Sequence, residues 1–178
     1  MSPQRSKPSG RSTAKGIYAL VFSNPACTLP VGGLGEARFR RGWHVYIGSA
    51  RGPGGFARVR RHLRLSRARD RPPRWHVDYL LLSPFFTLRH IACGPCDGDL
   101  ECSLARAFGG AAVPSFGSGD CGCRSHLFHR TADPLEEVMD AMSSLGLAPR
   151  STTLIKSIPP FGRSLQCVFR LSVKHIKG

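Results

Sequence analysis

The stretch GWHVYIGSARGPGGFARVRRHL, residues 42–63, changes its hydrophobic period at a glycine-rich turn. Before the turn, residues 43–50 carry the β-branched and aromatic side chains of a strand. After the turn, Phe56, Val59 and Leu63 recur at the spacing of one helical face. A strand and a helix joined by so short a turn favour a fold in which helices pack on a sheet.

Other short runs predict further strands. β-branched and aromatic residues predict strands over residues 17–23 and 85–93, and turn residues bound a shorter strand at 28–31. Residues 75–82 fit either a short helix or another strand. We therefore expect a mixed α/β (α+β) fold, with a small and mostly antiparallel central sheet flanked by helices.

Two more helices are expected in the second half of the chain. One covers residues 100–108, where either Asp97 or Asp99 is placed to cap the first turn. The other begins after Asp133 and Pro134, which fit an N-cap followed by proline at the first helical position. The glycine- and serine-rich stretch between these helices is expected to be a loop.

The charge of the chain bears on its partners rather than on its fold. The formal net charge is +15, from 26 Lys and Arg against 11 Asp and Glu. Phosphates attract clustered arginines, so nucleic acid is the expected partner, DNA more than RNA. Residues 51–74 hold nine arginines and one acid, which favours a phosphate track over a merely solvated face. The arginines expected to contact nucleic acid are Arg51, Arg60, Arg61, Arg64 and Arg67.

The sequence shows neither a membrane-spanning segment nor a signal peptide, and these two observations set the expected localisation. No run approaches the roughly 20 apolar residues of a membrane-spanning helix, and residues 1–15 lack the apolar core of a signal peptide. We therefore expect a cytoplasmic protein without a membrane partner. In that compartment the seven cysteines would be reduced thiols or metal ligands rather than a disulfide framework.

Two tripeptides on predicted strands, Gly16-Ile17-Tyr18 and Tyr46-Ile47-Gly48, are followed by a helix that carries Arg58 and His62 four residues apart. Glu101 follows on a later predicted helix. Either tripeptide alone is a weak signal, but their order and their placement on strands are specific. Together these residues resemble the motifs of the GIY-YIG nuclease superfamily.

A closer resemblance is to a branch called domain of unknown function 123. It covers about residues 16–128 and is carried by the runs VGGLGE, YIGSA, RVRRHL, WHVDYLL, LECSLA and DCGCRSHLF. Pro114-Ser115-Phe116 also resembles the segment that closes the superfamily's domain. Members of the branch occur alone or fused to base-excision repair glycosylases, so the resemblance implies a role in DNA repair.

Composition, local patterns and this resemblance together divide the chain into four parts. Residues 1–15 are expected to be a disordered basic tail, and residues 16–131 a GIY-YIG-like domain. An accessory helix follows over residues 132–148. Residues 149–178 form a basic C-terminal extension that is expected to be poorly ordered, with CVFRLSV at 167–173 as a candidate for one more strand.

Hydrolysis of a phosphodiester needs an attacking water and neutralisation of the charge that develops on the phosphate. A cation near a phenol lowers the phenol's pKa from its usual value of about 10, arginine contacts phosphate with two donors, and one carboxylate can hold a magnesium ion. The resemblance implies these roles: Tyr46 as general base or water positioner, Tyr18 as its partner, Arg58 on the phosphate, His62 in support, and Glu101 on Mg²⁺ or another divalent cation.

Each of these residues also has a purely structural explanation. Tyr18 and Tyr46 could be half-buried strand tyrosines with bonded hydroxyls. Arg58 alone would usually be a solvated helix residue, and Glu101 alone would suit a helix N-terminus. Their joint occurrence in the right order favours the functional interpretation.

Three residues that follow the arginine-rich stretch stay open. Trp75 fits stacking on a base, although a core tryptophan is the commoner case. His76 and Asp78 are two residues apart and would share a face only on a strand. Either they assist the site or they bond to the backbone, and we favour the second alternative.

The cysteines form a second group with the chemistry of a metal site. Cys93-x-x-Cys96 has the spacing of a zinc-ligand pair, and Cys121-x-Cys123-x-x-His126 supplies three further ligands at an unusual spacing. Two complete CxxC pairs are absent, so reduced, partly buried thiols are favoured over a Zn²⁺ site.

Three function classes therefore remain. The preferred one is a divalent-metal-dependent endonuclease that acts on DNA. The first alternative is a nucleic-acid-binding module of the same fold without turnover. The second alternative is a zinc-stabilised interaction domain.

Overall fold

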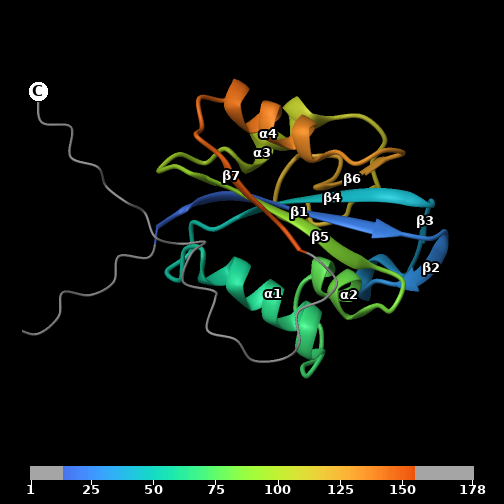
Figure 1. The fold of residues 1–178 in the computed structure, drawn as a ribbon. Helices are drawn as coiled ribbons and strands as arrows, with labels where there is room; N and C mark the ends of the chain where they lie inside the picture. The colour runs from blue at the N-terminus through green and yellow to red at the C-terminus, as the bar shows by residue number, and fades with distance from the viewer. Residues whose placement is uncertain (1–13, 155–178) are drawn as a thin grey trace, which may run out of the picture.

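The structure is a computed structural model that describes residues 14–154. Within these residues the chain forms a five-stranded antiparallel sheet in the order β6-β4-β1-β5-β7 (Figure 1). Its strands are β1 (Gly16–Asn24), β4 (Gly42–Ser49), β5 (Thr87–Pro95), β6 (Leu127–Arg130) and β7 (Arg150–Thr153). A hairpin of β2 (Cys27–Pro30) and β3 (Glu36–Phe39) lies in the connection from β1 to β4.

Helices cover both faces of the sheet. The four α-helices of the described chain are α1 (Ala57–Ala68), α2 (His76–Leu82), α3 (Glu101–Phe108) and α4 (Leu135–Ser144). Figure 1 shows α1 and α2 on one face and α3 and α4 on the other. The expected α+β class with an antiparallel sheet between helices is therefore confirmed.

The central strand β1 contributes to both cores. Tyr18 and Leu20 pack in the cluster that contains α1 and α2. Ile17 and Ala19, which point to the opposite face, pack in the cluster of α3 and α4. A strand covered on both faces needs an almost continuous apolar sequence, and this requirement explains the run from Gly16 to Phe22.

The neighbouring strand β4 places one tyrosine of the motifs. Val45 and Ile47 pack toward α3 and α4, whereas Tyr46 packs against the α1 and α2 cluster. Because Tyr18 and Tyr46 share this face on adjacent strands, their rings are brought together. Helix α1 then runs under the same face, with Val59 and Leu65 buried.

The residues that hold the N-cap positions of α3 and α4 differ from those predicted from the sequence. Neither Asp97 nor Asp99 caps α3, because Leu100 holds the N-cap position without a side-chain bond, and Asp99 pairs with Arg51 at 3.3 Å. At α4, the carboxylate of Asp133 accepts a hydrogen bond from the N–H of Leu135 at 3.1 Å, as expected, although Pro134 holds the N-cap. Residues 75–82 were expected to form either a short helix or a strand, and residues 76–82 form a helix.

The C-terminal part of the described chain joins the main fold. Val138 and Met142 of α4 are buried against the sheet, and β7 pairs with β5. The start of the predicted extension is thus an edge strand. The rest of that extension, with its candidate strand, and nearly all of the predicted tail lie outside the described residues. No helix within residues 14–154 is long and apolar enough to cross a membrane.

Candidate active site

Tyr18 is held in the interior by its neighbours on two elements. Its side chain is 1% exposed, and its hydroxyl lies 3.0 Å from Nε2 of His62 on α1. Gly48 is its partner across the β1–β4 ladder. A Cβ on Gly48 would lie 2.5 Å from Cζ of Tyr18, so the glycine of the second tripeptide leaves room for the tyrosine of the first.

The glycine of the first tripeptide has a backbone reason. A Cβ on Gly16 would overlap the carbonyl oxygen of Gly94 on β5, and it would lie 2.8 Å from the ring of Phe56. Strand β1 therefore starts where two backbones and the beginning of α1 meet closely. Such an approach requires glycine.

Tyr46 lies beside Tyr18 at the same end of the sheet. The two ring centroids are 6.4 Å apart, and the Tyr46 ring also packs edge-on against Phe116 at 6.2 Å. Phe116 is fully buried and belongs to the segment that resembled a closing element. The N–H of Gly117 donates to Nδ1 of His76 at 3.2 Å, which ties that segment to α2.

Arg58 reaches toward the same region from the first turn of α1. Its NH1 donates to the carbonyl of Ser49 at 2.9 Å, and its guanidinium carbon lies 5.0 Å from the ring centre of Trp75. Arg61 and Arg74 also lie against that ring, at 4.2 and 5.5 Å. Trp75 is therefore a platform for three guanidinium groups, packed against the core, rather than an open surface for a base.

Behind Tyr18 lies a chain of polar groups that joins His62, which the sequence assigned to the site, to Asp78, which the sequence left open between assisting the site and bonding to the backbone. Asp78 is fully buried and accepts hydrogen bonds from NH1 and NH2 of Arg61 at 3.0 and 2.7 Å. Its Oδ2 also accepts from the backbone N–H groups of Arg74 and Trp75. Nδ1 of His62 lies 3.5 Å from Oδ1 of Asp78, too long for a good hydrogen bond, and has no other partner within residues 14–154. Asp78 thus supports His62 as well as the backbone.

Burial sets the pKa of the phenols. Burial raises the pKa of Tyr46 above its usual value of 10, the charge of Glu101 raises it further, and Arg58 opposes both with a smaller effect. Burial likewise raises the pKa of Tyr18 well above 10. Arg58 thus lowers the pKa of Tyr46 as expected, but the net shift is upward, because the desolvation of a phenolate outweighs one guanidinium.

The pKa values of His62 and Asp78, the histidine and the carboxylate behind Tyr18, are both lowered. Burial lowers the pKa of His62 despite the opposing effect of Asp78, so the imidazole is neutral at pH 7. Burial alone would raise the pKa of Asp78, but the nearby imidazole of His62 and hydrogen bonds from Arg61 and the backbone lower it well below 3.8. The carboxylate is thus ionised and the imidazole is not.

Glu101 comes from the helix layer on the other face of the sheet. It is the first residue of α3, and its side chain is 23% exposed. Its Oε1 lies 3.2 Å from Nδ1 of His126, which is 2% exposed, although Nδ1 makes no hydrogen bond within residues 14–154. The carbonyl of His126 accepts a hydrogen bond from the N–H of Ile47 at 2.9 Å, next to Tyr46. The carboxylate therefore faces a residue whose backbone is bonded to the strand that carries Tyr46.

The predicted catalytic residues thus come together. The charges of Glu101 and Arg58 both act on the hydroxyls of Tyr18 and Tyr46, in opposite directions. His62 contacts Tyr18 directly. A cation, a carboxylate and two phenols from β1, β4, α1 and α3 lie around one end of the sheet, although their chemical roles remain predictions.

The cysteines group differently from the sequence prediction. Cys102, Cys121, Cys123 and His126 place their ligand atoms within 4.8 Å of one another. Cys93 and Cys96 are not part of this group: Cys93 packs against the core on β5, and Sγ of Cys96 faces the carbonyl of Gly98. Cys96 follows the end of β5 and packs against the opposite core from Cys93, so the CxxC spacing gives no ligand pair there. The sequence analysis did not include Cys102 among the possible zinc ligands, because the residues that share its group lie about 20 positions later in the chain.

Comparison with protein families identifies the chain. The family model described as "Domain of unknown function DUF123" matches residues 17–147, which include α4. The chain belongs to the DUF123 family. Comparison with curated proteins gave no match, and neither did comparison with solved structures. The family boundary extends beyond the predicted limit at residue 131, in agreement with the packing of α4.

The predicted DNA-contacting arginines of this DUF123 chain differ in their surroundings. Arg61 points inward to Asp78, and Arg64 pairs with Asp70 at 3.1 Å on the surface. Arg51 pairs with an acid as well, as described above, and Arg67 is exposed near the end of α1. A surface pocket of about 270 Å³ is lined by Ala57, Arg60, Arg61, Arg64, Leu65, Asp70 and Arg71.

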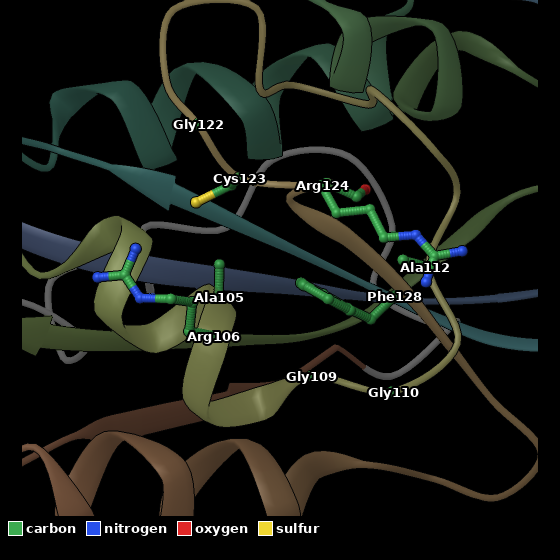
Figure 2. Close-up of a pocket in the computed structure, with 10 residues that line it drawn as sticks. Ala105, Arg106, Gly109, Gly110, Ala112, Gly122, Cys123, Arg124 and Phe128 are labelled. Atoms are coloured by element: carbon green, nitrogen blue, oxygen red, sulfur yellow. The ribbon is translucent and has the colours of Figure 1, made fainter.

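A second pocket of about 270 Å³ lies on the opposite helix layer of the DUF123 domain. Figure 2 shows it between α3 and the chain that leads into β6, with Arg106 and Arg124 extending on either side. Cys123 and Phe128 contribute to its wall. This pocket is next to the cysteine group, whereas the arginine-lined pocket lies along α1.

Proposed function

We propose that this protein is a divalent-metal-dependent endonuclease of the GIY-YIG superfamily that hydrolyses phosphodiester bonds in DNA, with a role in repair. The observation that carries the proposal is that the charges of Arg58 on α1 and Glu101 on α3 both act on Tyr46, whose ring lies beside that of Tyr18. Phosphoryl chemistry needs a cation and a metal-binding carboxylate around one attacking water. We place the protein in the cytoplasm, where reduced thiols persist.

Arg58 is the residue proposed to bind the scissile phosphate. One donor, NH1, is used by the carbonyl of Ser49, and the face of the guanidinium rests on Trp75. Both contacts fix the plane of the group, so that the remaining donors can approach two phosphate oxygens together. Lysine could not make this contact.

Glu101 is proposed to hold a magnesium ion. Magnesium sites often use one or two carboxylates, with water and phosphate oxygens as the other ligands. A carboxylate that is 23% exposed, with Oε1 3.2 Å from Nδ1 of His126, suits this requirement. When bound, the ion would neutralise negative charge that develops on the phosphate.

Tyr46 is proposed to orient the attacking water. Because burial and Glu101 raise its pKa, the phenol keeps its proton at pH 7 and can donate or accept a hydrogen bond. A role as general base requires additional positive charge from bound substrate or metal. Positioning is therefore the role that the charges of this chain favour.

Tyr18 and His62 are proposed to support this arrangement from behind. The nearby carboxylate of Asp78 favours the proton of His62 on Nδ1, so Nε2 accepts from the Tyr18 hydroxyl. The oxygen of Tyr18 is then available as an acceptor. His62 is thus a positioning residue.

The second candidate is a DNA-binding module without turnover. The raised pKa of Tyr46 favours it, because a phenol that keeps its proton at pH 7 is a weak general base. The basic face of α1 would bind phosphates in either case. Both candidates share the DNA partner and differ only in cleavage.

Nicking of supercoiled plasmid with Mg²⁺ separates the two. We expect the parent to nick DNA, and we expect Tyr46→Phe, Arg58→Ala and Glu101→Ala to lose at least about 100-fold in rate. Glu136→Gln, on the exposed side of α4, is the control and should keep the parent's rate. Fluorescence anisotropy should show DNA binding by all variants. If the parent binds DNA but does not cleave it with any divalent cation, the endonuclease proposal fails and the DNA-binding module is the remaining candidate.

A further inference from the structure

The group of Cys102, Cys121, Cys123 and His126 combines two segments that are distant in the sequence. Cys102 lies in the first turn of α3, and the other three lie in the loop before β6. Nε2 of His126 is 3.5 Å from Sγ of Cys121 and 4.0 Å from Sγ of Cys102. The four ligand atoms surround one point.

The dimensions of the group fit a tetrahedral ion. With Zn–S bonds of about 2.3 Å and a Zn–N bond of about 2.0 Å, ligand atoms lie roughly 3.5–3.8 Å apart. The observed separations of 3.5 to 4.8 Å need a contraction of about 1 Å or less. Rotation of cysteine side chains about χ1 supplies such a shift without movement of the backbone.

The surroundings of His126 fit a metal ligand. The ring is almost fully buried, and its Nδ1 faces the carboxylate of Glu101 at 3.2 Å. Histidines that bind a metal through one nitrogen commonly donate the other N–H to a carboxylate. A proton on Nδ1 leaves the lone pair of Nε2 directed at the sulfurs. Neutral thiols alone would offer that nitrogen only weak donors.

We propose that Cys102, Cys121, Cys123 and His126 bind one zinc ion, with Glu101 orienting His126 from outside the ligand set. Thiolates and imidazole select zinc over magnesium or calcium. Four protein ligands fill a tetrahedral site, so the ion is structural and takes no substrate. It ties the loop that precedes β6 to α3.

This zinc site adjoins the candidate active site without depending on it. The carbonyl of His126 bonds to the backbone beside Tyr46, and Nδ1 of His126 lies 3.2 Å from the carboxylate of Glu101. The ion therefore fixes the position of Glu101 relative to Tyr46. Zinc binding requires no cleavage activity, so failure of the nuclease proposal and failure of the zinc proposal give different results.

Zinc content of the reduced full chain is the first test. Elemental analysis should give one zinc per chain, and release by a mercurial should give the same number with a colorimetric chelator. Cys102→Ser should bind zinc at least about 10-fold more weakly, and Glu101→Gln about 10- to 100-fold more weakly. Cys93→Ser and Cys96→Ser are the matched controls and should keep one zinc.

X-ray absorption of the zinc-loaded parent tests the ligand set without any variant. We expect three sulfurs and one nitrogen around zinc. A parent that stays folded and reduced without binding zinc would overturn the proposal. The proposal would also be overturned by a shell with two or four sulfurs, or by loss of zinc in Cys93→Ser or Cys96→Ser equal to that in Cys102→Ser.

Discussion

Replacement of Gly48 by alanine should disturb Tyr18, although the two residues are on different strands. A Cβ on Gly48 would lie 2.5, 2.6 and 2.9 Å from Cζ, Oη and Cε2 of Tyr18. Ordinary contacts between carbon atoms are 3.5–4.0 Å, so the ring must move by about 1 Å. Tyr18 is 1% exposed, so it has no solvent-filled space to enter.

Three effects set the magnitude. Overpacking of a filled interior costs about 1–3 kcal/mol. Loss of the 3.0 Å hydrogen bond to His62 leaves buried polar atoms unsatisfied, at about 1–3 kcal/mol. Alanine reduces the freedom of the unfolded chain, which stabilises the protein by about 0.4–1 kcal/mol. We expect Gly48→Ala to lower the free energy of unfolding by about 3 kcal/mol.

Urea unfolding followed by tryptophan fluorescence measures this change. Gly33→Ala is the control, because a Cβ there has no atom within 4 Å, and it should change the stability by less than about 0.5 kcal/mol. In a Tyr18→Ala background, Gly48→Ala should lose most of its cost, with a coupling of about 2 kcal/mol. An equal cost with and without the tyrosine ring would refute the steric explanation.

Three further predictions concern other parts of the fold. Asp78→Asn leaves Arg61 facing a neutral amide, so urea unfolding should show a loss of about 3 kcal/mol, and an unchanged stability would contradict the buried pair. Burial, and then His129, lower the pKa of His44 from 6.5 to about 3, so the unfolded state binds the proton more readily below pH 6.5. Relative to His44→Gln, the parent should therefore lose about 2 kcal/mol from pH 7 to pH 5, and parallel pH profiles would be inconsistent with this shift. Met142→Ala should cost about 3 kcal/mol in thermal or urea unfolding if α4 is integral to the core, and less than 1 kcal/mol if it is not.

Elements whose pattern is local could be predicted from the sequence. Strand β1 and helix α1 carry complete apolar patterns over nine and twelve residues. Strands β3, β6 and β7 have four residues each, and their formation depends on pairing with β2, β4 and β5. Such short strands have little signal of their own, because the neighbouring strand supplies the stabilisation.

The site residues also divide into those that a local sequence pattern predicts and those that depend on tertiary packing. Tyr18, Tyr46, Arg58 and Glu101 were found because their tripeptides and spacings match a known pattern. Asp78 became part of the site only because α2 packs against α1, a tertiary contact that its own sequence position does not encode. The pKa direction of Tyr46 also required the structure, since desolvation depends on what surrounds the ring.

Arg58→Lys tests the central claim most directly, because it keeps the charge and removes the two-donor contact with phosphate. The measurement is the single-turnover rate of plasmid nicking with Mg²⁺, at protein concentrations that saturate the DNA. Arg38→Lys, at an exposed position of β3 with no role in the site, is the control. The account predicts a loss of at least about 100-fold for Arg58→Lys and the parent's rate for Arg38→Lys. Equal rates for the two variants, or no cleavage by the parent, would contradict a phosphate-binding Arg58 beside Tyr46 and Glu101.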